Sequence, residues 1–429
     1  MERRIHPNAI LAWVGFVLLI GSGAFASGDE PKEIMWLVDG ARYKPIALCG
    51  NSSEFDWPGQ YGIIINEDGE IIERAPGKVW PRQLTDELVL LSSIQENRDI
   101  PKRRLIRNDR RVKYESDLAA WTIGNGWLMC ADRGRFGMGG GATRTKLADG
   151  TVTKELKYFY FDDQLERVDD IRSSLGIDLR GQKLIGFIEP SGIPVVEEPG
   201  TKLQRIIKDD GSFSKNAFYQ IDFERRFIKH PVLVNAQAIP QRWLYDPIDD
   251  KKVLAFRWTM STNALSEVLV LNTGEGELAG VYDARLNRIA ELGFRIQPAF
   301  VTSEDILVCV DRVQTDVVQH RVFKAYQVIL EPDESTADRL IEIDASWIKE
   351  IELRQIDGPL YAVRNQADEL VILDAMLEPA MTLGPSYDIR RITKSGHVLV
   401  VDRETHVYSL YGSDGELIRD FDVAALLDE

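Results

Sequence analysis

The stretch SGHVLVVDRETHVYSLYGSDGELIRDF, residues 395–421, predicts three short strands separated by two tight turns. The strands at 397–401, 406–411 and 416–421 are rich in β-branched, aromatic and aliphatic residues, and Gly, Ser and Asp stand between them, as is typical of antiparallel hairpins. The same order of strands and turns occurs at 357–383, and a fainter copy covers 267–292. Because one such unit buries neither of its faces alone, we expect the units to stack around a ring.

Short apolar runs of the same kind recur along the whole chain. They lie at 62–65, 127–131, 184–188, 253–256, 306–310, 360–363 and 398–401. Repeated short strands bounded by turn residues predict an all-β fold. We expect a β-propeller of about seven blades, between six and eight, in a single domain at 27–429. A β-sandwich also spaces short strands regularly and is the alternative.

Two stretches predict small helical insertions between the blades. In the first, at 85–96, Thr85 is a suitable N-cap and Leu84, Leu88 and Leu91 share one helical face. In the second, at 162–175, apolar residues recur at helical spacing. Neither stretch is bounded by a Pro/Ser-rich linker, so both are expected to be insertions and not separate domains.

The C-terminal units resemble the NHL repeat of secreted propellers. The resemblance rests on a glycine, an apolar strand, an aspartate, a second strand, an Asp-x-x-Gly turn and a closing strand, and it is clear over 350–421. It is thin over 250–330 and largely absent before residue 250. The resemblance implies a ring of six to eight blades that often serves as a binding scaffold, and it implies no particular activity.

The first 26 residues have the parts of a cleavable secretory signal peptide. Arg3 and Arg4 form a basic start, an apolar run covers 9–20, and 24–26 reads Ala-Phe-Ala, the pattern that signal peptidase accepts. A permanent anchor is the alternative, but the glycines and serine at 21–23 dilute a segment that needs roughly 20 apolar residues to span a bilayer. We therefore expect an exported protein, periplasmic or extracellular, without membrane insertion after cleavage.

The net charge limits the possible binding partners, and the number of cysteines limits the possible disulfides. The formal net charge of −16 disfavours binding to nucleic acid or to anionic lipid, because both are repelled by an acidic surface. Cys49, Cys130 and Cys309 are too few for a disulfide framework. Cys130 and Cys309 lie in apolar runs, so buried thiols are favoured, although one disulfide between two of the three is possible on sequence grounds.

Three aspartates are candidates for a metal site. Asp132, Asp311 and Asp402 each follow an apolar run and precede an arginine. Equivalent aspartates could converge at a propeller channel, where carboxylates suit calcium, as in propeller-type lactonases. The alternative is that each caps a turn through a hydrogen bond to the backbone, which explains the recurrence without a ligand. The four histidines beyond the leader lack the spacing of zinc or copper ligands, so no cofactor other than calcium is suggested.

A basic segment at 102–113 is the candidate for contact with an anionic ligand or an acidic partner. It contains Arg103, Arg104, Arg107, Arg110 and Arg111. The alternative is a solvated loop that pairs with nearby acidic residues. A glycine-rich segment at 134–143 lacks the lysine of a phosphate-binding loop and is better explained as a hairpin loop.

The function that these features favour is an exported, non-enzymatic propeller that binds a protein or ligand on one face. A calcium-dependent hydrolase or lactonase of propeller type is one alternative, and it depends on the three aspartates alone. A structural or sensor module of a cell-envelope complex is the other. No serine-nucleophile motif of the G-x-S-x-G type occurs in the chain.

Overall fold

Antiparallel strands make up almost all of the regular structure in the computed structural model of the chain. The structure describes residues 32–39, 60–93, 102–114, 118–124, 126–132, 142–146, 152–156, 158–169, 171–176, 178–179, 181–188, 192–198, 201, 203–208, 210–221, 232–235, 242–246, 251–256, 258–259, 266–272, 279–283, 286–293, 296–314, 319–331, 339–353 and 358–429. The chain divides into Met1–Lys32 and Glu33–Glu429, and every sheet belongs to the second unit.

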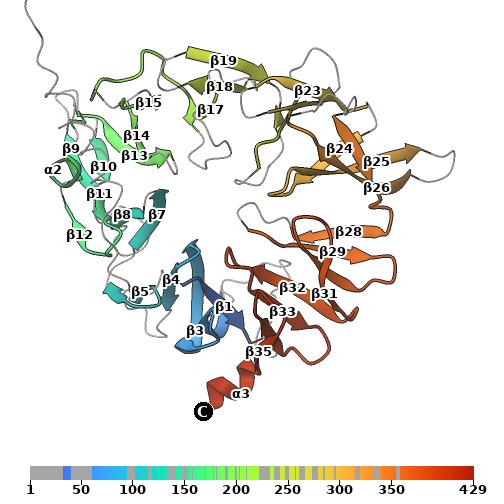
Figure 1. Cartoon of the computed structure of the whole chain (residues 1–429). Coiled ribbons are helices and arrows are strands. Elements are labelled where there is room, and N and C mark those ends of the chain that lie inside the picture. The colour runs from blue at the N-terminus through green and yellow to red at the C-terminus, as the bar shows by residue number, and fades with distance from the viewer. Residues whose placement is uncertain are drawn as a thin grey trace, which may run out of the picture. The chain divides into compact units, whose positions relative to one another are not determined.

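The described strands form eight small antiparallel sheets and one separate two-stranded hairpin, β9–β10 (Figure 1). The N-terminal sheet contains β1 (Ile34–Val38), β2 (Gln60–Asn66), β3 (Ile71–Thr85), β4 (Leu88–Ser93), β5 (Lys102–Ile106) and β6 (Arg111–Tyr114). The second sheet contains β7 (Leu118–Gly124), β8 (Trp127–Asp132), β11 (Tyr158–Phe161) and β12 (Arg167–Val168). The separate hairpin consists of β9 (Ala142–Lys146) and β10 (Val152–Leu156).

The next three sheets are smaller or less regular. They contain β13 (Lys183–Ile188), β14 (Ile193–Glu197) and β15 (Gln204–Ile206); then β16 (Gln220–Ile221), β17 (Val232–Asn235), β18 (Arg242–Asp246) and β19 (Lys251–Phe256); then β20 (Trp258–Thr259), β21 (Leu269–Asn272), β22 (Gly280–Tyr282) and β23 (Arg288–Glu291).

The last three sheets have four strands each in chain order. They contain β24 (Ile296–Val301), β25 (Ile306–Gln314), β26 (Gln319–Val328) and β27 (Leu340–Ile343); then β28 (Ile348–Leu353), β29 (Tyr361–Asn365), β30 (Leu370–Leu373) and β31 (Pro379–Leu383); then β32 (Tyr387–Ile392), β33 (Val398–Asp402), β34 (Tyr408–Tyr411) and β35 (Leu417–Phe421). The two described helices are α2 (Ile171–Leu175) and α3 (Val423–Asp428).

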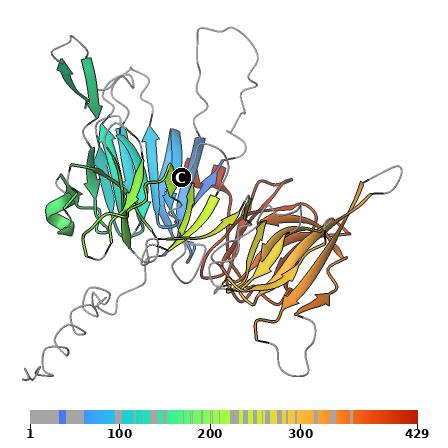
Figure 2. The same cartoon turned by 90° about the horizontal axis from the view of Figure 1, so that it is seen from above.

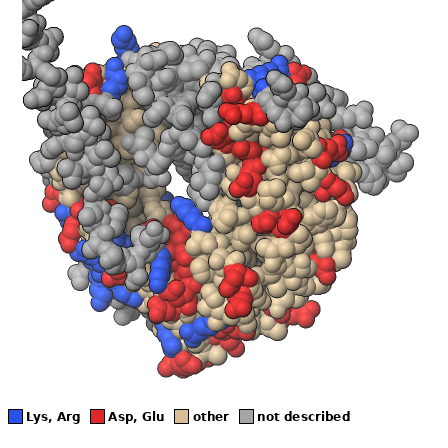
Figure 3. All heavy atoms as spheres, in the orientation of Figure 1, with Lys and Arg blue, Asp and Glu red and all other residues tan. Residues whose placement is uncertain are grey.

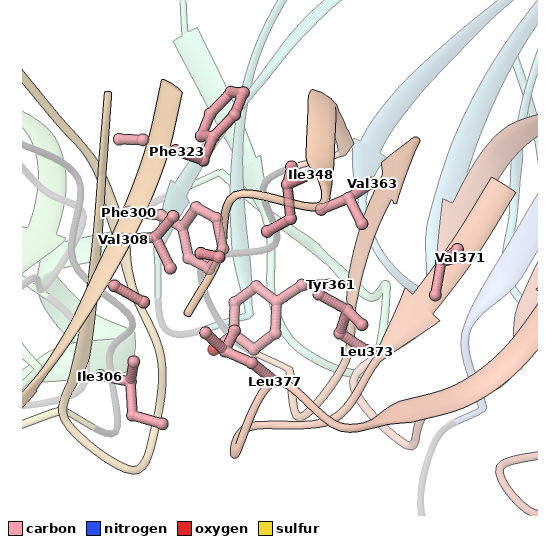
Figure 4. Close-up of a cluster of buried hydrophobic side chains, with 13 residues drawn as sticks. Phe300, Ile306, Val308, Phe323, Ile348, Tyr361, Val363, Val371, Leu373 and Leu377 are labelled. Carbon is pink, nitrogen blue, oxygen red and sulfur yellow. The ribbon is translucent and has the colours of Figure 1, made fainter. Parts of the chain in front are cut away.

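This arrangement confirms the predicted all-β propeller. Each of the seven apolar runs lies in a strand, except that Leu360 comes just before β29, and the eight sheets fall within the expected range of six to eight. Consecutive strands pair with one another inside each of the last five sheets, as in a propeller blade and unlike the crossing connections of a sandwich. Apolar clusters fill the spaces between neighbouring sheets, and Figure 4 shows the one between β24–β26 and β28–β30.

One five-residue turn recurs between paired strands. The backbone N–H of its first residue bonds the carbonyl of the fifth, and the N–H of the fourth bonds the carbonyl of the first. The fourth residue has a positive φ, as in three-residue hairpin loops that end in a left-handed position. A side-chain oxygen of the first residue accepts from the N–H of the fifth at Asn66, Asp162, Asp283, Thr302, Asn365, Asp374 and Thr393. This hydrogen bond explains why Asn, Asp and Thr occur at the positions where strands end.

The predicted helix at 85–96 is wrong. Leu88–Ser93 is strand β4, and the four residues Leu88, Val89, Leu90 and Leu91 are all buried. Leu88 and Leu90 join the apolar cluster shared with the second sheet, while Val89 and Leu91 join a cluster formed by β1 to β5 of the first sheet. Because both faces are covered, a continuous apolar run forms a strand here.

The predicted helix at 162–175 is confirmed only at its end. A five-residue turn and strand β12 occupy its first part, and α2 covers Ile171–Leu175. Leu165, one of the apolar residues at helical spacing in this stretch, is buried at the left-handed position of the turn, with φ of 55°. Its burial in the core compensates the backbone strain that a non-glycine residue has at a positive φ.

The two ends of the propeller meet without exchanging strands. None of the described sheets combines strands from the N-terminal and C-terminal parts. Instead, apolar side chains of β1 and β2 pack against those of β33 and β34, and α3 covers the same cluster through Val423. The backbone N–H of Val38 also donates to the Tyr408 hydroxyl at 3.3 Å. The first and last sheets are therefore joined by side-chain contacts and not by shared strands. We call this junction the seam, and it lies between β1 and β33 in Figure 1.

Candidate functional site

A cluster of charged and polar side chains lies at the seam between the first and last sheets. We call it the seam cluster, and it consists of Glu33, Glu67, Asp86, Arg391, Lys394, Ser395 and His397. Glu33 precedes β1, Glu67 lies in the turn after β2, and Arg391 lies on β32. In the view of Figure 3, acidic and basic side chains lie next to one another below the opening in the molecular surface.

The buried carboxylate of Glu33 is the centre of the ionic part. Arg391 Nη2 lies 2.8 Å from Glu33 Oε2 and 2.5 Å from Asp86 Oδ1. The backbone N–H of Lys394 donates to Glu33 Oε1 at 2.7 Å, and Lys394 Nζ pairs with Asp86 Oδ2 at 3.0 Å. Both oxygens of Glu33 are thus satisfied, which offsets the cost of burying its charge. Beside this group, burial raises the pKa of Glu87, and the charges of Arg107 and Lys394 oppose the rise.

The second part of the seam cluster brings a serine, a histidine and a carboxylate together. Ser395 Oγ donates to Glu67 Oε2 at 2.6 Å and lies 2.9 Å from His397 Nδ1. The same Nδ1 lies 3.5 Å from Glu67 Oε2. A catalytic triad needs the serine on one ring nitrogen and the carboxylate on the other, so that the histidine can accept the serine proton. Here the hydroxyl proton points to Glu67, and the geometry is that of a structural network which joins the turn after β32 to the turn after β2.

A buried arginine joins the last two sheets. The side chain of Arg364, on β29, is only 6% exposed. It donates to the backbone carbonyls of Asp368 and Tyr387, at 2.8 Å each, and pairs with Glu352 and Asp388. A hydrogen bond from Arg403 is the main reason why the pKa of Asp388 is lowered. This network holds β28 and β32 at fixed positions relative to each other.

The basic segment at 102–113 lies on β5, β6 and the turn between them. Arg104 and Arg111 pair with Glu73 of the same sheet, and Arg107 pairs with Asp109. Arg107 and Arg110 also donate to the carbonyls of Asp163 and Gln164, in the turn before β12, and Arg110 pairs with Glu166. Arg103 lies on β5 with them. Four of the five arginines thus hold the first sheet and its contact with the second, and their role in partner contact stays a prediction.

The three candidate aspartates lie on three different sheets. Asp132 is the last residue of β8, whereas Asp311 is not at a strand end, since β25 continues to Gln314. Asp311 Oδ2 lies 3.4 Å from Lys324 Nζ. Asp402 accepts a hydrogen bond from the Glu404 N–H at 2.8 Å, as a turn-capping aspartate does. Within the described part of the chain, no group of three or more His, Cys, Asp or Glu side chains is placed to hold a metal ion, and calcium binding stays a prediction.

Cys130 and Cys309 are free and buried, each at 0% exposure. Burial raises the pKa of both thiols to about 12. Both therefore remain protonated at neutral pH and act as small apolar side chains, as predicted. Cys49 and most of the glycine-rich segment at 134–143 lie outside the described residues.

These thiols are expected to be unreactive in the folded protein. In a Cys49→Ser variant at pH 8, dithionitrobenzoate should label neither Cys130 nor Cys309 until denaturant is added, because the reagent needs an accessible thiolate. The measurement is the absorbance of released thionitrobenzoate before and after unfolding. Labelling of one full equivalent while the circular dichroism spectrum is unchanged would contradict the burial of these thiols.

Sequence reasoning missed the seam cluster completely. Glu33 and Arg391 are 358 positions apart, and no local pattern marks either residue. Ser395 and His397 belong to the quoted C-terminal unit, where Ser395 was predicted only to lie in a turn and His397 only to begin a strand. Their proximity to Glu67 arises because the two ends of the chain meet.

Comparisons with known proteins find only distant structural similarities. No family model matches the sequence, and no curated protein is significantly similar to it. The match to a structure of a eukaryotic initiation factor covers 91% of this chain and 96% of the initiation factor, with 9% sequence identity and a TM-score of 0.47. For the dihydro-heme d1 dehydrogenase NirN, the match covers 93% of this chain and 75% of NirN, with 12% sequence identity and a TM-score of 0.39. For BamB from Moraxella catarrhalis, it covers 79% of this chain and 94% of BamB, with 10% sequence identity and a TM-score of 0.30. These are distant similarities to β-propeller proteins, and they concern the fold alone.

Proposed function

We propose that the protein is an exported β-propeller that acts as a non-enzymatic binding or scaffold module for a protein partner. The signal-peptide pattern at 1–26 supports export. In the described part of the chain, no helix has the length and apolar character needed to cross a bilayer. The fold supports a scaffold role only in general terms, since propellers with the same architecture serve many functions.

The observation that carries the proposal is the placement of large exposed apolar side chains. Five such residues occur among the described ones, and four of them belong to the last three sheets. Ile341 lies on the outer strand β27, Met376 in the turn between β30 and β31, and Leu417 and Ile418 on the outer strand β35. Exposed apolar side chains that occur mainly on a few neighbouring sheets are available for contact with another protein.

Site-specific photo-crosslinking in the producing cells tests this proposal. A photoreactive residue at position 341 or 417 is expected to crosslink one and the same protein, and Leu417→Ser is expected to reduce the yield from position 341. The control is position 164, because Gln164 is exposed in a turn of the second sheet. Equal crosslinking at all three positions, or hydrolysis of small esters or lactones by the purified protein, would contradict the proposal.

A further inference from the structure

The seam differs from the other junctions between sheets in how the chain runs. Sheets that follow one another in sequence stay connected by the chain when their side chains separate. The first and last sheets have no such connection, because Glu33 and Arg391 are 358 positions apart and Val38 and Tyr408 are 370 apart. None of the described sheets contains strands from both ends. At the seam, side-chain contacts therefore oppose the entropy that is gained when a long loop opens.

Helix α3 follows the last strand of the last sheet but contacts β2 and β3 of the first sheet. Figure 2 shows the C-terminal end of the chain beside the blue strands of the first sheet. Val423 is buried in the apolar cluster of the seam, and Leu426 and Leu427 pack against this cluster from partly buried positions. An ion pair of 3.1 Å joins Arg74 of β3 to Glu429, the C-cap of α3. The helix thus spans the seam, and we call it the latch.

The latch is weakly held. A helix of six residues is unstable by itself in water, so α3 depends on its packing. The side chains of its ion pair are exposed, Arg74 at 40% and Glu429 at 63%, and such pairs contribute little. Of its three apolar anchors, Val423 is buried and the other two are only partly buried. We therefore expect the latch to undock at a lower free energy than a blade needs to unfold.

We propose that the propeller opens reversibly at the seam, with α3 as the latch, while the individual sheets stay folded. The latch leaves first, and the apolar contacts of β1 and β2 with β33 and β34 then separate together with the ion pairs of the seam cluster. The sheets keep their backbone hydrogen bonds, because no strand of the first sheet pairs with a strand of the last. This motion goes beyond the proposed binding role and does not depend on it.

Labelling of a cysteine buried in the seam measures the opening. Val401 on β33 belongs to the apolar cluster of the seam and is 4% exposed, so Val401→Cys in a Cys49→Ser background is the probe. The matched control is Val308→Cys on β25, in the apolar cluster between two sheets that are consecutive in the chain. We expect a thiol reagent to label position 401 about ten times faster than position 308, because labelling requires the sheets to separate.

A pair of variants assigns the opening to the latch. Leu426→Gln, Leu427→Gln should raise the labelling rate at position 401 about tenfold, because two partly buried leucines lose their contacts. Ile341→Gln, Leu417→Gln also removes two apolar side chains, but these are 47% and 51% exposed, and the rate should not change.

A disulfide across the seam should block the opening. A Cβ atom added to Gly69, in the turn between β2 and β3, would lie 3.5 Å from the Cβ of Arg419 on β35, which is within the range of a disulfide. Gly69 has a φ of 77°, and Asp305 and Leu377 adopt a positive φ at the same position of their turns. A cysteine is therefore compatible with this position. Oxidised Gly69→Cys, Arg419→Cys should be labelled at position 401 about ten times more slowly than Gly69→Ser, Arg419→Ser.

Three outcomes would overturn the proposal: equal labelling at positions 401 and 308, an unchanged rate in the latch variant, and equal rates in the disulfide and serine variants. Hydrogen exchange of the wild-type protein tests the proposal without a core substitution. The Lys394 N–H donates to Glu33 across the seam and should exchange faster than the His397 N–H, which donates to Thr393 in its own turn. Equal exchange of the two would also contradict the opening. All these measurements use the purified protein without a partner, so they and the crosslinking experiment can fail independently.

Discussion

Replacing Arg391 with alanine should lower the free energy of unfolding by about 3 kcal/mol. The substitution leaves Glu33, whose side chain is 7% exposed, without its guanidinium partner and removes a bridge to Asp86. Breaking a buried pair from one side is costly because the remaining charge stays desolvated. Because no sheet in the described part of the chain spans the seam, the two ends are held there by side-chain contacts such as this one. Urea denaturation followed by circular dichroism and tryptophan fluorescence measures the effect.

The control for this prediction is Arg403→Ala. Arg403 also pairs with an aspartate, Asp388, but its side chain is 53% exposed, and water replaces the lost partner. Its removal is expected to leave the denaturation midpoint almost unchanged. The double variant Glu33→Gln, Arg391→Met should recover much of the stability lost in Arg391→Ala, since it leaves no unpaired charge. Equal midpoints for Arg391→Ala and Arg403→Ala would refute a stabilising role of the seam cluster.

Replacing Tyr361 with alanine is expected to cost about 3 to 5 kcal/mol of stability. Tyr361, on β29, has no exposed surface, and its ring stacks on Phe300 of the neighbouring sheet with centroids 4.9 Å apart (Figure 4). The alanine variant leaves a cavity between two blades, which the surrounding side chains can fill only in part. Thermal and urea denaturation measure the loss.

Two further variants separate the parts of this contact. Tyr361→Phe keeps the stacked ring but loses the hydrogen bond from the Ser303 N–H, which is 3.1 Å long, and should cost about 1 kcal/mol. Tyr219→Ala removes a tyrosine that is 53% exposed and should change stability by less than about 0.5 kcal/mol. If Tyr361→Ala were no more destabilising than Tyr361→Phe, the packing between the blades would not be the source of the effect.

The hairpins of the propeller could be predicted because their determinants are local. The turn at Thr393 is specified within five residues, by a side chain that accepts from the N–H of His397 and by Gly396 at positive φ. The same holds for Asn365 and Asp374, even though Asp368 and Leu377 occupy the position where glycine is expected. Strand runs next to such turns are therefore visible in the sequence.

The helix predicted at 85–96 shows where local patterns fail. Leu88, Val89, Leu90 and Leu91 fit a helical face as well as a strand, because a continuous apolar run has no unique period. Tertiary packing decides, since one face of β4 packs against the second sheet and the residues of the other face join an apolar cluster within the first sheet. The basic segment is a similar case: Arg107 and Arg110 find acceptors at residues 163–166, which no reading of 102–113 alone could indicate.

The sequence by itself determined the all-β class, the repeated strand-and-turn unit and the burial of Cys130 and Cys309, because these depend on side chains within a few residues of one another. Only the tertiary structure decided the seam cluster, the position of Asp311 within a strand and the separation of β9–β10 from the other sheets. The physical reason is that closure brings together residues from opposite ends of the chain. Ion pairs and core contacts between such residues depend on their distance in space, which cannot be inferred from their separation along the chain.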